Sequence, residues 1–307
     1  MQTVLITGGT GLVGTALALY LAKNNYSVII LTRNSKNVLK EANISYALWS
    51  INDNTIDIAS FQKADAIIHL AGAGVMDKKW TASYKKEIEE SRTKSSLLLV
   101  HTLKNYSHKV KTIISTSAIG WYGADKLPST FFTETDTVDK SFLGAVCYNW
   151  EQSITPATTM DIRLCILRLG IVLSNKGGAY VAFKKSLRYG IASILGSGSQ
   201  IISWIHINDL CRQFLFALEN KNLNGVYNAV APLPISNKAL ILTIAKAIRN
   251  TFYLTINIPT FVLKIILGKR SIEVLKSTTV SSAKIKSEGF TFLYPSIESA
   301  INELEKK

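Results

Sequence analysis

Three glycines near the start of the chain have the spacing of a phosphate-binding loop. Gly8, Gly11 and Gly14 follow a short β-branched and apolar run, Thr3–Thr7, and a stretch of helical periodicity, Leu12–Lys23, begins among them. In a strand–loop–helix unit, such glycines allow a tight turn, a close approach of backbone to pyrophosphate and close helix–sheet packing, with the helix N-terminus facing the negative charge. The spacing therefore predicts a dinucleotide site.

The end of the second apolar run indicates which dinucleotide. Leu31-Thr32-Arg33-Asn34 has no acidic residue where an NAD-specific site binds the ribose hydroxyls. A guanidinium at Arg33 suits a 2′-phosphate, because it can hold the phosphate by two hydrogen bonds while it stacks on adenine. We therefore expect NADP(H), with Lys36 as a weaker cation for the same phosphate; a solvated surface Arg33 is the alternative.

A third segment, HLAGAG from His69 to Gly74, places small residues after a buried run, where ligands lie in open α/β sheets. Ala71 and Gly72 would let the cofactor pass close to the backbone, unless the segment is a plain turn. His69 precedes the loop within the strand and is expected to be packed rather than catalytic. The residues expected to contact the cofactor are Gly8, Thr10, Gly11, Leu12, Val13, Gly14, Thr32, Arg33, Leu70, Ala71, Gly72 and Arg92.

These segments need a scaffold, and the pattern of the chain supplies one. Short runs that are apolar on both faces are typical of buried parallel strands, and they alternate with amphipathic helical stretches. The expected strands are Thr3–Thr7, Ser27–Leu31, Ala66–Ala71, Thr112–Thr116 and Val226–Val230, and the expected helices are Leu12–Lys23, Tyr84–Lys104, Phe142–Ile154 and Asp209–Glu219. The pattern predicts an α/β fold with a Rossmann, doubly wound parallel sheet and a smaller C-terminal α/β substrate domain.

The expected division of the chain into domains follows from a change in sequence pattern after Gly170, where glycine pairs and loops begin. Residues 1–170 are assigned to the cofactor domain, with 205–230 returning to it, and 171–204 and 231–307 to the substrate domain. The chain has 307 residues and a formal net charge of +14. Because the lysines are scattered, we expect a small anionic substrate and cofactor rather than nucleic acid.

Cysteine usage and hydropathy indicate the cellular compartment in which we expect the protein. Cys147, Cys165 and Cys211 are widely spaced and lack the C-x-x-C spacing of metal or redox sites, so a reducing cytoplasm and no metal are expected. The apolar N-terminal stretch lacks the layout of a signal peptide. The apolar run from Phe261 to Leu267 contains Lys264 and is too short to span a bilayer, so no membrane partner is expected.

A series of segments in order resembles the short-chain dehydrogenase/reductase superfamily in its extended, nucleotide-sugar-epimerase-like form. More narrowly, it resembles an atypical epimerase-like family whose members are usually labelled nucleoside-diphosphate-sugar epimerases. The segments are ITGGTGLVG, LTR, HLAGAG, SRTKS, STSAIGWYG, FLGAVCYNWE, RLGIVLS, GSGSQIISWIHINDL, GVYNAVAP and GFTFLYP. The resemblance implies NADP(H) between strand ends and helices, a cleft closed by the second domain, and a monomer or homodimer.

The resemblance also implies catalytic residues, and here the chain departs from the superfamily. Ser117 matches the active-site Ser/Thr, with a loop-capping serine as the alternative. The superfamily's Tyr and Lys, which act as general acid/base and as its positive neighbour, fall on Leu143 and Cys147. Neither can do that chemistry. Tyr122 is the best replacement proton donor, with a packed aromatic as the alternative.

The segment GSGSQIISWIHINDL resembles the superfamily's substrate-binding loop. Its backbone N–H groups at Gly196, Ser197 and Gly198 could bind a phosphate or carboxylate. Trp204 and His206 would then border the cleft. Asp209 is expected to be the N-cap of the next helix, and Asn228 to face the cleft.

Two functions from different classes fit this pattern. The first is an NADP(H)-dependent oxidoreductase or epimerase-like enzyme acting on a small polar substrate, in which Ser117 orients the reacting oxygen and Tyr122 donates a proton. The second is a protein that binds NADP(H) without catalysis, as a redox sensor or regulator. The missing Tyr–Lys pair favours the second, whereas Ser117 and the substrate loop favour the first.

Overall fold

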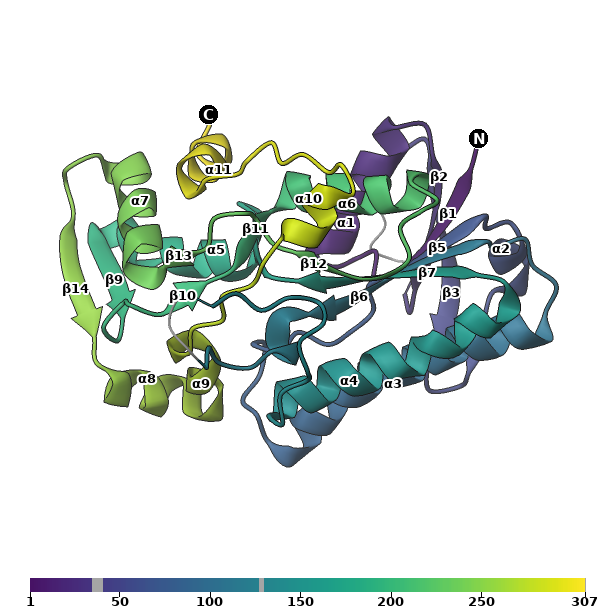
Figure 1. Ribbon diagram of the computed structural model, residues 1–307, viewed down its shortest axis with the longest axis horizontal. Helices are drawn as coiled ribbons and strands as arrows, with labels where there is room; N and C mark the ends of the chain where they lie inside the picture. The colour runs from purple at the N-terminus through teal and green to yellow at the C-terminus, as the bar shows by residue number, and fades with distance from the viewer. Residues whose placement is uncertain (35–40, 127–129, 307) are drawn as a thin grey trace.

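An eight-stranded sheet runs through the centre of the protein, whose computed structural model describes residues 1–34, 41–126 and 130–306 (Figure 1). The strand order is β12-β7-β6-β5-β1-β2-β3-β4. All neighbours are parallel except β4, which is antiparallel to β3. The strands are β1 (Thr3–Thr7), β2 (Ser27–Thr32), β3 (Ile44–Ser50), β4 (Thr55–Ile56), β5 (Ala66–His69), β6 (Thr112–Ala118), β7 (Arg163–Leu169) and β12 (Gly225–Ala229).

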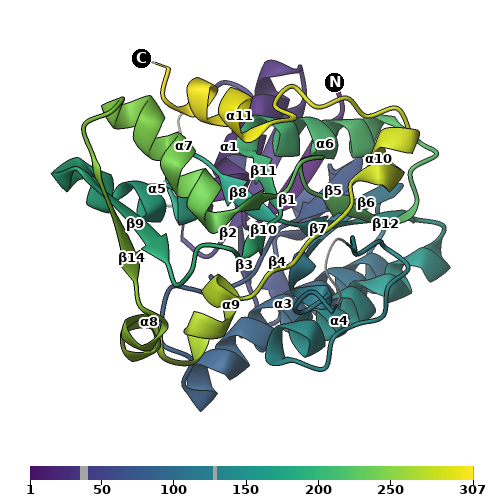
Figure 2. The same ribbon diagram turned by 60° about the vertical axis from the view of Figure 1, so that its left-hand side comes forward.

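Helices cover both faces of this sheet, as Figures 1 and 2 show. One face carries α1 (Leu12–Lys23), α6 (Ile207–Glu219) and α10 (Ala283–Ser287), and the other carries α2 (Ile58–Gln62), α3 (Ala82–Asn105) and α4 (Phe142–Ile154). Successive strand residues point to opposite faces, so Val4 and Ile6 pack under α1 and α6 whereas Leu5 packs with the α3 side. Two 3-10 turns, η1 (Ile119–Trp121) and η2 (Thr155–Met160), flank α4.

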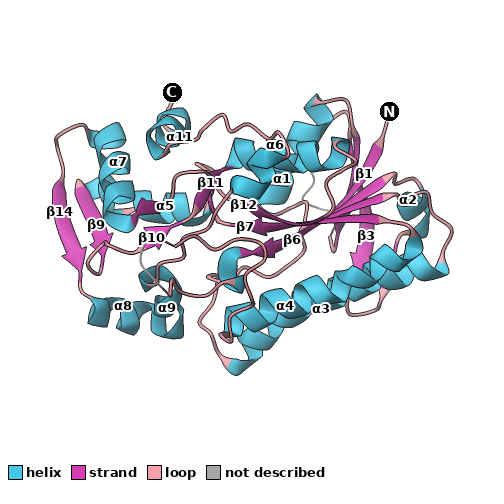
Figure 3. Ribbon diagram, in the orientation of Figure 1, coloured by secondary structure: helices cyan, strands magenta, loops and turns pink. Residues whose placement is uncertain are grey.

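The remaining elements form a smaller α/β unit beyond the carboxyl ends of the strands (Figure 3). It has its own core, which includes Tyr180, Trp204, Ile241 and Ile301. Its strands form two-stranded sheets, β8–β11, β9–β14 and β10–β13. The elements are β8 (Ile171–Leu173), α5 (Gly178–Lys184), η3 (Ser186–Tyr189), β9 (Ile191–Leu195), β10 (Ile201–Ile202), β11 (Trp204–His206), β13 (Ile235–Ser236), α7 (Asn237–Arg249), β14 (Leu254–Ile258), α8 (Thr260–Leu267), η4 (Gly268–Arg270), α9 (Ser271–Leu275) and α11 (Ile297–Leu304).

The predicted fold class is confirmed, and the main elements lie close to their predicted bounds. Helices α1 and α4 match exactly, while β5 ends two residues earlier than predicted, at His69. Strand β6 extends to Ala118, so Ser117 lies within the strand rather than after it. Within the described ranges, no helix has the length and apolar character needed to cross a membrane. The same residues contain no cluster of His, Cys, Asp and Glu that could hold a metal.

Candidate functional site

The glycine loop joins β1 to α1 and packs against the loop after β5. Gly8 has φ +67°, and a Cβ there would lie 2.7 Å from the carbonyl carbon and oxygen of Leu70. A Cβ at Gly14 would overlap the carbonyl oxygen of Gly8. The backbone therefore requires glycine at both places, for a left-handed turn and for close packing of helix on loop. Thr10 and Gly11 are exposed at the N-terminus of α1, while Leu12 packs against Gly178.

The N-terminus of α1 has unpaired backbone donors to offer. Its N-cap is Gly11, whose lack of a side chain leaves no capping oxygen for the first N–H groups. Val13 is partly buried and Thr15 donates its hydroxyl to the carbonyl of Gly9. The helix end therefore presents N–H groups that have no partner among the described residues, and the positive end of its dipole, beside the carboxyl edge of the sheet, which suits a phosphate.

Arg33 lies directly beyond β2, the strand that pairs with β1 and ends beside the glycine loop. Thr7 and Leu31 are partners in the register of these two strands. Thr32 is buried and accepts a hydrogen bond from Asn34 N at 3.2 Å, whereas Arg33 is exposed. The first charged group after β2 is therefore a solvent-facing guanidinium. Lys36 lies outside the described residues.

The loop after β5 is held from beneath by a buried polar row. Thr7 accepts hydrogen bonds from the N–H groups of Leu70 and Ala71, and its hydroxyl lies 2.7 Å from His69 Nδ1. His69 is fully buried, and burial lowers its pKa to about 3, so the ring is neutral at physiological pH. The prediction that His69 is packed within the strand is confirmed.

Arg92 of α3 lies against this loop. Its guanidinium donates to the carbonyls of Ala73 at 3.0 Å and Ile88 at 2.8 Å, and it stacks on Trp150 at 4.9 Å. A Cβ at Gly72 would lie 3.0 Å from Arg92 Cζ, so Gly72 leaves room for the guanidinium. No Asp or Glu of the described residues forms an ion pair with Arg92. This leaves a positive charge at the end of β5.

Ser117 lies near the end of β6, where α4 packs over it. Its hydroxyl is buried and has no hydrogen-bond partner within the described part of the chain. The side chains of α4 nearest to Gly120, just beyond this strand, are Leu143 and Cys147. Burial raises the pKa of the Cys147 thiol to about 11, so it is protonated at neutral pH. The face of α4 that packs on β6 thus presents neither a phenol nor an amine.

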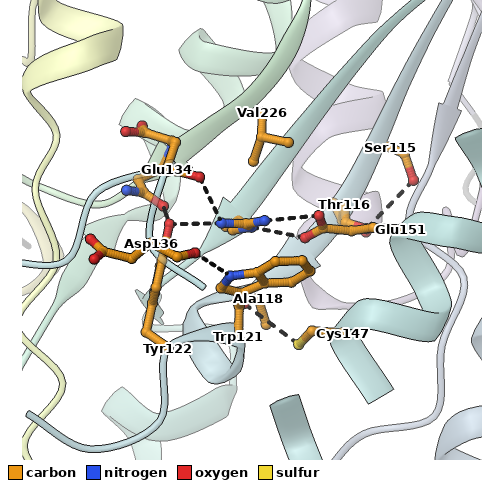
Figure 4. Close-up of polar contacts among 12 residues, drawn as sticks. Ser115, Thr116, Ala118, Trp121, Tyr122, Glu134, Asp136, Cys147, Glu151 and Val226 are labelled. Carbon is orange, nitrogen blue, oxygen red and sulfur yellow. Dashed lines mark hydrogen bonds and ion pairs between the residues drawn. The ribbon is translucent and has the colours of Figure 1, made fainter. Parts of the chain in front are cut away.

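Tyr122 belongs to a buried polar network on the other side of η1 (Figure 4). Its hydroxyl donates to Asn228 Oδ1 at 2.6 Å and accepts from Arg168 at 3.1 Å. Arg168 forms a two-point pair with Glu151 at 2.8 and 2.9 Å and stacks on Trp121 at 3.7 Å. Burial raises the pKa of Tyr122 to about 12.

This network corrects two expectations. Tyr122 is only 1% exposed and its one proton is already donated, so it is not available to a substrate in this structure. Asn228 does not face an open cleft, because its amide also donates to the carbonyl of Ser281. The buried ion pair of Arg168 and Glu151 was not predicted from the sequence. A detectable signal was Arg168, a charged residue near the carboxyl end of the otherwise apolar run LCILRL in β7.

The expected substrate loop is built differently from the prediction. Gly196 and Gly198 have φ of +62° and +76°, but Gly196 N donates to the carbonyl of Ile258 and Gly198 N donates to that of Leu195. Two of the three N–H groups that were expected to bind an anion are therefore occupied by backbone partners. Ser197 is exposed at the tip of this turn, with its hydroxyl 2.7 Å from that of Ser199.

The following segment is structural in this conformation. Trp204 is fully buried and donates to the carbonyl of Leu233. His206, not Asp209, is the N-cap of α6, because His206 Nδ1 accepts from Asn208 N. Asp209 lies in the first turn, where its carboxylate instead accepts the N–H groups of Leu293 and Tyr294, which lie far along the chain.

Comparisons with known proteins agree with this arrangement. The model of the NAD dependent epimerase/dehydratase family matches residues 4–229, and a domain of unknown function, DUF1731, matches residues 258–304. An epimerase family protein of Staphylococcus aureus is 35% identical over the full length of both chains. A human epimerase family protein, SDR39U1, crystallised with NADPH, is similar in fold, with a TM-score of 0.85, 24% identity and 99% coverage of both chains.

A bacterial protein adds a second structural likeness. A nucleoside-diphosphate sugar epimerase from Corynebacterium glutamicum is 29% identical, with a TM-score of 0.77; 99% of this chain matches 58% of that one. The family model covers most of the chain, and the relatives match it from end to end. The chain belongs to the NAD dependent epimerase/dehydratase family.

Proposed function

We propose that this protein binds NADP(H) along the glycine loop and acts as an oxidoreductase or epimerase-like enzyme on a small polar substrate, with nucleotide-linked sugars as one candidate class. The observation that carries the choice of NADP(H) is the exposed Arg33 directly beyond β2, next to the glycine loop. A guanidinium favours a 2′-phosphate, whereas a carboxylate there would repel it. The NADPH present with the human relative supports the same choice.

The residues present fit such a cofactor. Glycine at positions 8 and 14 permits the tight packing of the loop against Leu70 and of α1 against the loop, and the first N–H groups of α1, which have no partner among the described residues, can bind a pyrophosphate. Ser117 supplies a buried hydroxyl with no partner in the described ranges, at the strand edge where the reacting groups of such sheets gather. When bound, the nicotinamide supplies or accepts a hydride. Gly8, Thr10, Gly11, Leu12, Val13, Gly14, Thr32, Arg33, Leu70, Ala71, Gly72 and Arg92 are proposed to hold the cofactor.

Among the described residues, Ser117 and Arg92 are the groups that we propose to contact a reacting oxygen. The Ser117 hydroxyl can donate one hydrogen bond to a carbonyl or alcohol oxygen and so orient it. Arg92 adds a fixed positive charge at the neighbouring strand end, which would stabilise negative charge that develops on that oxygen. Tyr122 could join only if its hydroxyl left Asn228, so we assign the proton that the reduced carbonyl oxygen takes up to a water molecule rather than to Tyr122.

A second function is favoured by a specific observation. Leu143 and Cys147 occupy the face of α4 beside Gly120, and the Cys147 thiol is neutral. A chain that keeps the cofactor loop while offering no ionisable acid on this helix face could bind NADP(H) as a sensor of its redox state. This protein would bind NADPH and NADP⁺ with different affinities and would turn over neither.

Single-turnover oxidation of bound NADPH separates the two functions. The protein is mixed with a panel of carbonyl compounds that includes nucleotide-linked keto-sugars, and absorbance of the reduced nicotinamide is followed. Enzyme function predicts loss of absorbance with at least one compound, and about a 10²-fold slower rate in Ser117→Ala. Ser287→Ala, on the exposed end of α10, is the matched control and should react at the wild-type rate.

The alternative outcomes are distinct. Binding of NADPH without turnover of any compound would favour the sensor. Turnover that is equally fast in Ser117→Ala would refute the role of Ser117 while leaving the enzyme function in place.

A further inference from the structure

The outer end of the C-terminal unit exposes large apolar side chains. Phe261 and Ile265 of α8 are 65% and 76% exposed, and Ile266 beside them is also exposed. In Figures 1 and 2, α8 and β14 lie at the periphery of the molecule, away from the eight-stranded sheet. These side chains therefore lie outside both cores and away from the cofactor loop.

Helix α8 exposes more apolar than charged side chains, with Lys264 as its one charged residue. Phe261 and Ile265 are one turn apart and share one side of the helix, whereas Leu263 is buried against the protein. Strand β14, which leads into α8, pairs only with β9 among the described strands and exposes Leu254 and Ile256. Several large apolar side chains of β14 and α8 are thus exposed to water, with polar residues such as Thr255 and Asn257 between them.

Positive charge accompanies this apolar stretch. Between residues 246 and 272 the sequence contains five Lys or Arg residues and no Asp or Glu. Lys246, Lys264 and Lys269 are exposed, and none of them forms an ion pair within the described ranges. We call Phe261, Lys264, Ile265, Ile266 and Lys269 the α8 face.

The combination of exposed apolar side chains and lysines restricts the class of partner that the α8 face can bind. A second copy of the chain would bring the same uncompensated lysines against one another, which disfavours self-association through this face. Nucleic acid would satisfy the lysines but would leave Phe261 and Ile265 without an apolar phase. An anionic lipid bilayer satisfies both, because its surface attracts lysines and its interface accepts apolar side chains.

We propose that the α8 face binds the surface of anionic membranes, with α8 lying in the plane of the interface. Phe261, Ile265 and Ile266 enter the region between headgroups and acyl chains, while Lys264 and Lys269 remain at the level of the anionic headgroups. The expectation of no membrane partner rested on the lack of a spanning segment; an eight-residue helix is too short to span but long enough to lie on the surface.

Vesicle co-sedimentation of the full chain tests the proposal. Wild type is expected to sediment with vesicles of phosphatidylcholine and phosphatidylglycerol about tenfold more strongly than with phosphatidylcholine alone. Two double variants should each lose about tenfold in partitioning: Phe261→Ser with Ile265→Ser, and Lys264→Glu with Lys269→Glu. In addition, Phe261→Trp should show a blue shift of its emission when the anionic vesicles are added.

Matched controls distinguish binding through the α8 face from nonspecific hydrophobic adsorption and from an effect of net charge. Leu97→Ser with Tyr106→Ser removes exposed apolar groups from α3 and its C-cap, and Lys23→Glu with Lys104→Glu makes the same change in net charge elsewhere. Both controls should sediment like wild type, and all variants should bind NADPH unchanged. The proposal is overturned if wild type does not bind anionic vesicles, if the charge control loses as much as the face variant, or if Phe261→Ser with Ile265→Ser converts a dimer to a monomer without affecting vesicle binding.

Discussion

At the scale of single residues, the proton chemistry of the site depends on what α4 presents beside Gly120. The Cys147 thiol, with a pKa raised to about 11 by burial, keeps its proton at neutral pH, and Leu143 has none to exchange. The nearby polar side chains that remain are Ser117, which can orient an oxygen, and Arg92, which can stabilise charge on it. The site is thus better equipped to hold and polarise a ligand than to transfer protons.

Buried histidines give a prediction for stability against pH. His206 is 1% exposed, and burial lowers its folded pKa from 6.5 to about 4. Between these values the unfolded chain binds a proton that the folded chain does not, so stability falls as the pH falls. From pH 6.5 to about pH 5, His206 alone should lower the free energy of unfolding by about 2 kcal/mol.

Urea unfolding at a series of pH values measures this contribution. His206→Asn keeps a capping acceptor for α6 and removes the titration, so the loss of stability over that range should shrink by about the same 2 kcal/mol. His101→Gln, at an exposed position of α3, should unfold with the wild-type pH dependence. An unchanged slope in His206→Asn would mean that His206 is accessible to protons in the folded state.

At the scale of elements, the approach of two loops shapes the cofactor site, and Gly8 is where they meet. Gly8→Ala places a Cβ 2.7 Å from the backbone of Leu70 at a positive φ, so we expect NADPH affinity to fall by more than about tenfold. Gly225→Ala is the matched control, because it has φ +82° with nothing within 4 Å.

Calorimetric titration with NADPH and urea unfolding distinguish the effect of a positive φ, which both glycines have, from the effect of a steric clash with Leu70, which only Gly8→Ala creates. Gly225→Ala should lower the free energy of unfolding by roughly 1–2 kcal/mol and bind NADPH normally. Gly8→Ala should lose more stability than this as well as affinity. Equal effects of the two substitutions would show that loop contact is unimportant.

The contact between α4 and β7 depends on a buried ion pair. Arg168 and Glu151 are 2% and 5% exposed and make two hydrogen bonds, which raise the pKa of Arg168 despite its burial. Arg168→Met or Glu151→Met leaves one buried charge alone and should lower the free energy of unfolding by about 3–5 kcal/mol. The double variant should lose much less than the sum, and additivity in urea unfolding would contradict a coupled pair.

Much of the scaffold could be predicted from the sequence, because buried parallel strands and amphipathic helices have distinct patterns. The glycine loop and the burial of His69 followed from spacing and from position along a strand. The hydrogen-bond partners of Tyr122, Asn228 and Gly196 could not be predicted, since each partner lies far away in the sequence. Hydrogen bonds between distant segments leave no periodic signal.

At the scale of the whole molecule, the two proposed binding surfaces lie in different parts of the fold. The carboxyl edge of the sheet gathers the cofactor loop, Arg33 and Arg92, whereas the α8 face lies at the outer end of the C-terminal unit. The net charge of +14 suits anionic ligands at both places. That the protein does not bind nucleic acid, which we expect because its lysines are scattered, stays a prediction. The boundaries between the cofactor and substrate parts, and cytoplasmic location, likewise stay predictions.

The central claim is that the cofactor is NADP(H), recognised through Arg33, and isothermal titration calorimetry at physiological salt tests it most directly. We expect wild type to bind NADPH at least about tenfold more tightly than NADH, a difference of about 1.4 kcal/mol. Arg33→Ala should lose this preference without weaker NADH binding, and the exposed Arg188→Ala should behave as wild type. Equal affinity of the wild-type protein for NADH and NADPH, or an undiminished preference in Arg33→Ala, would contradict the claim.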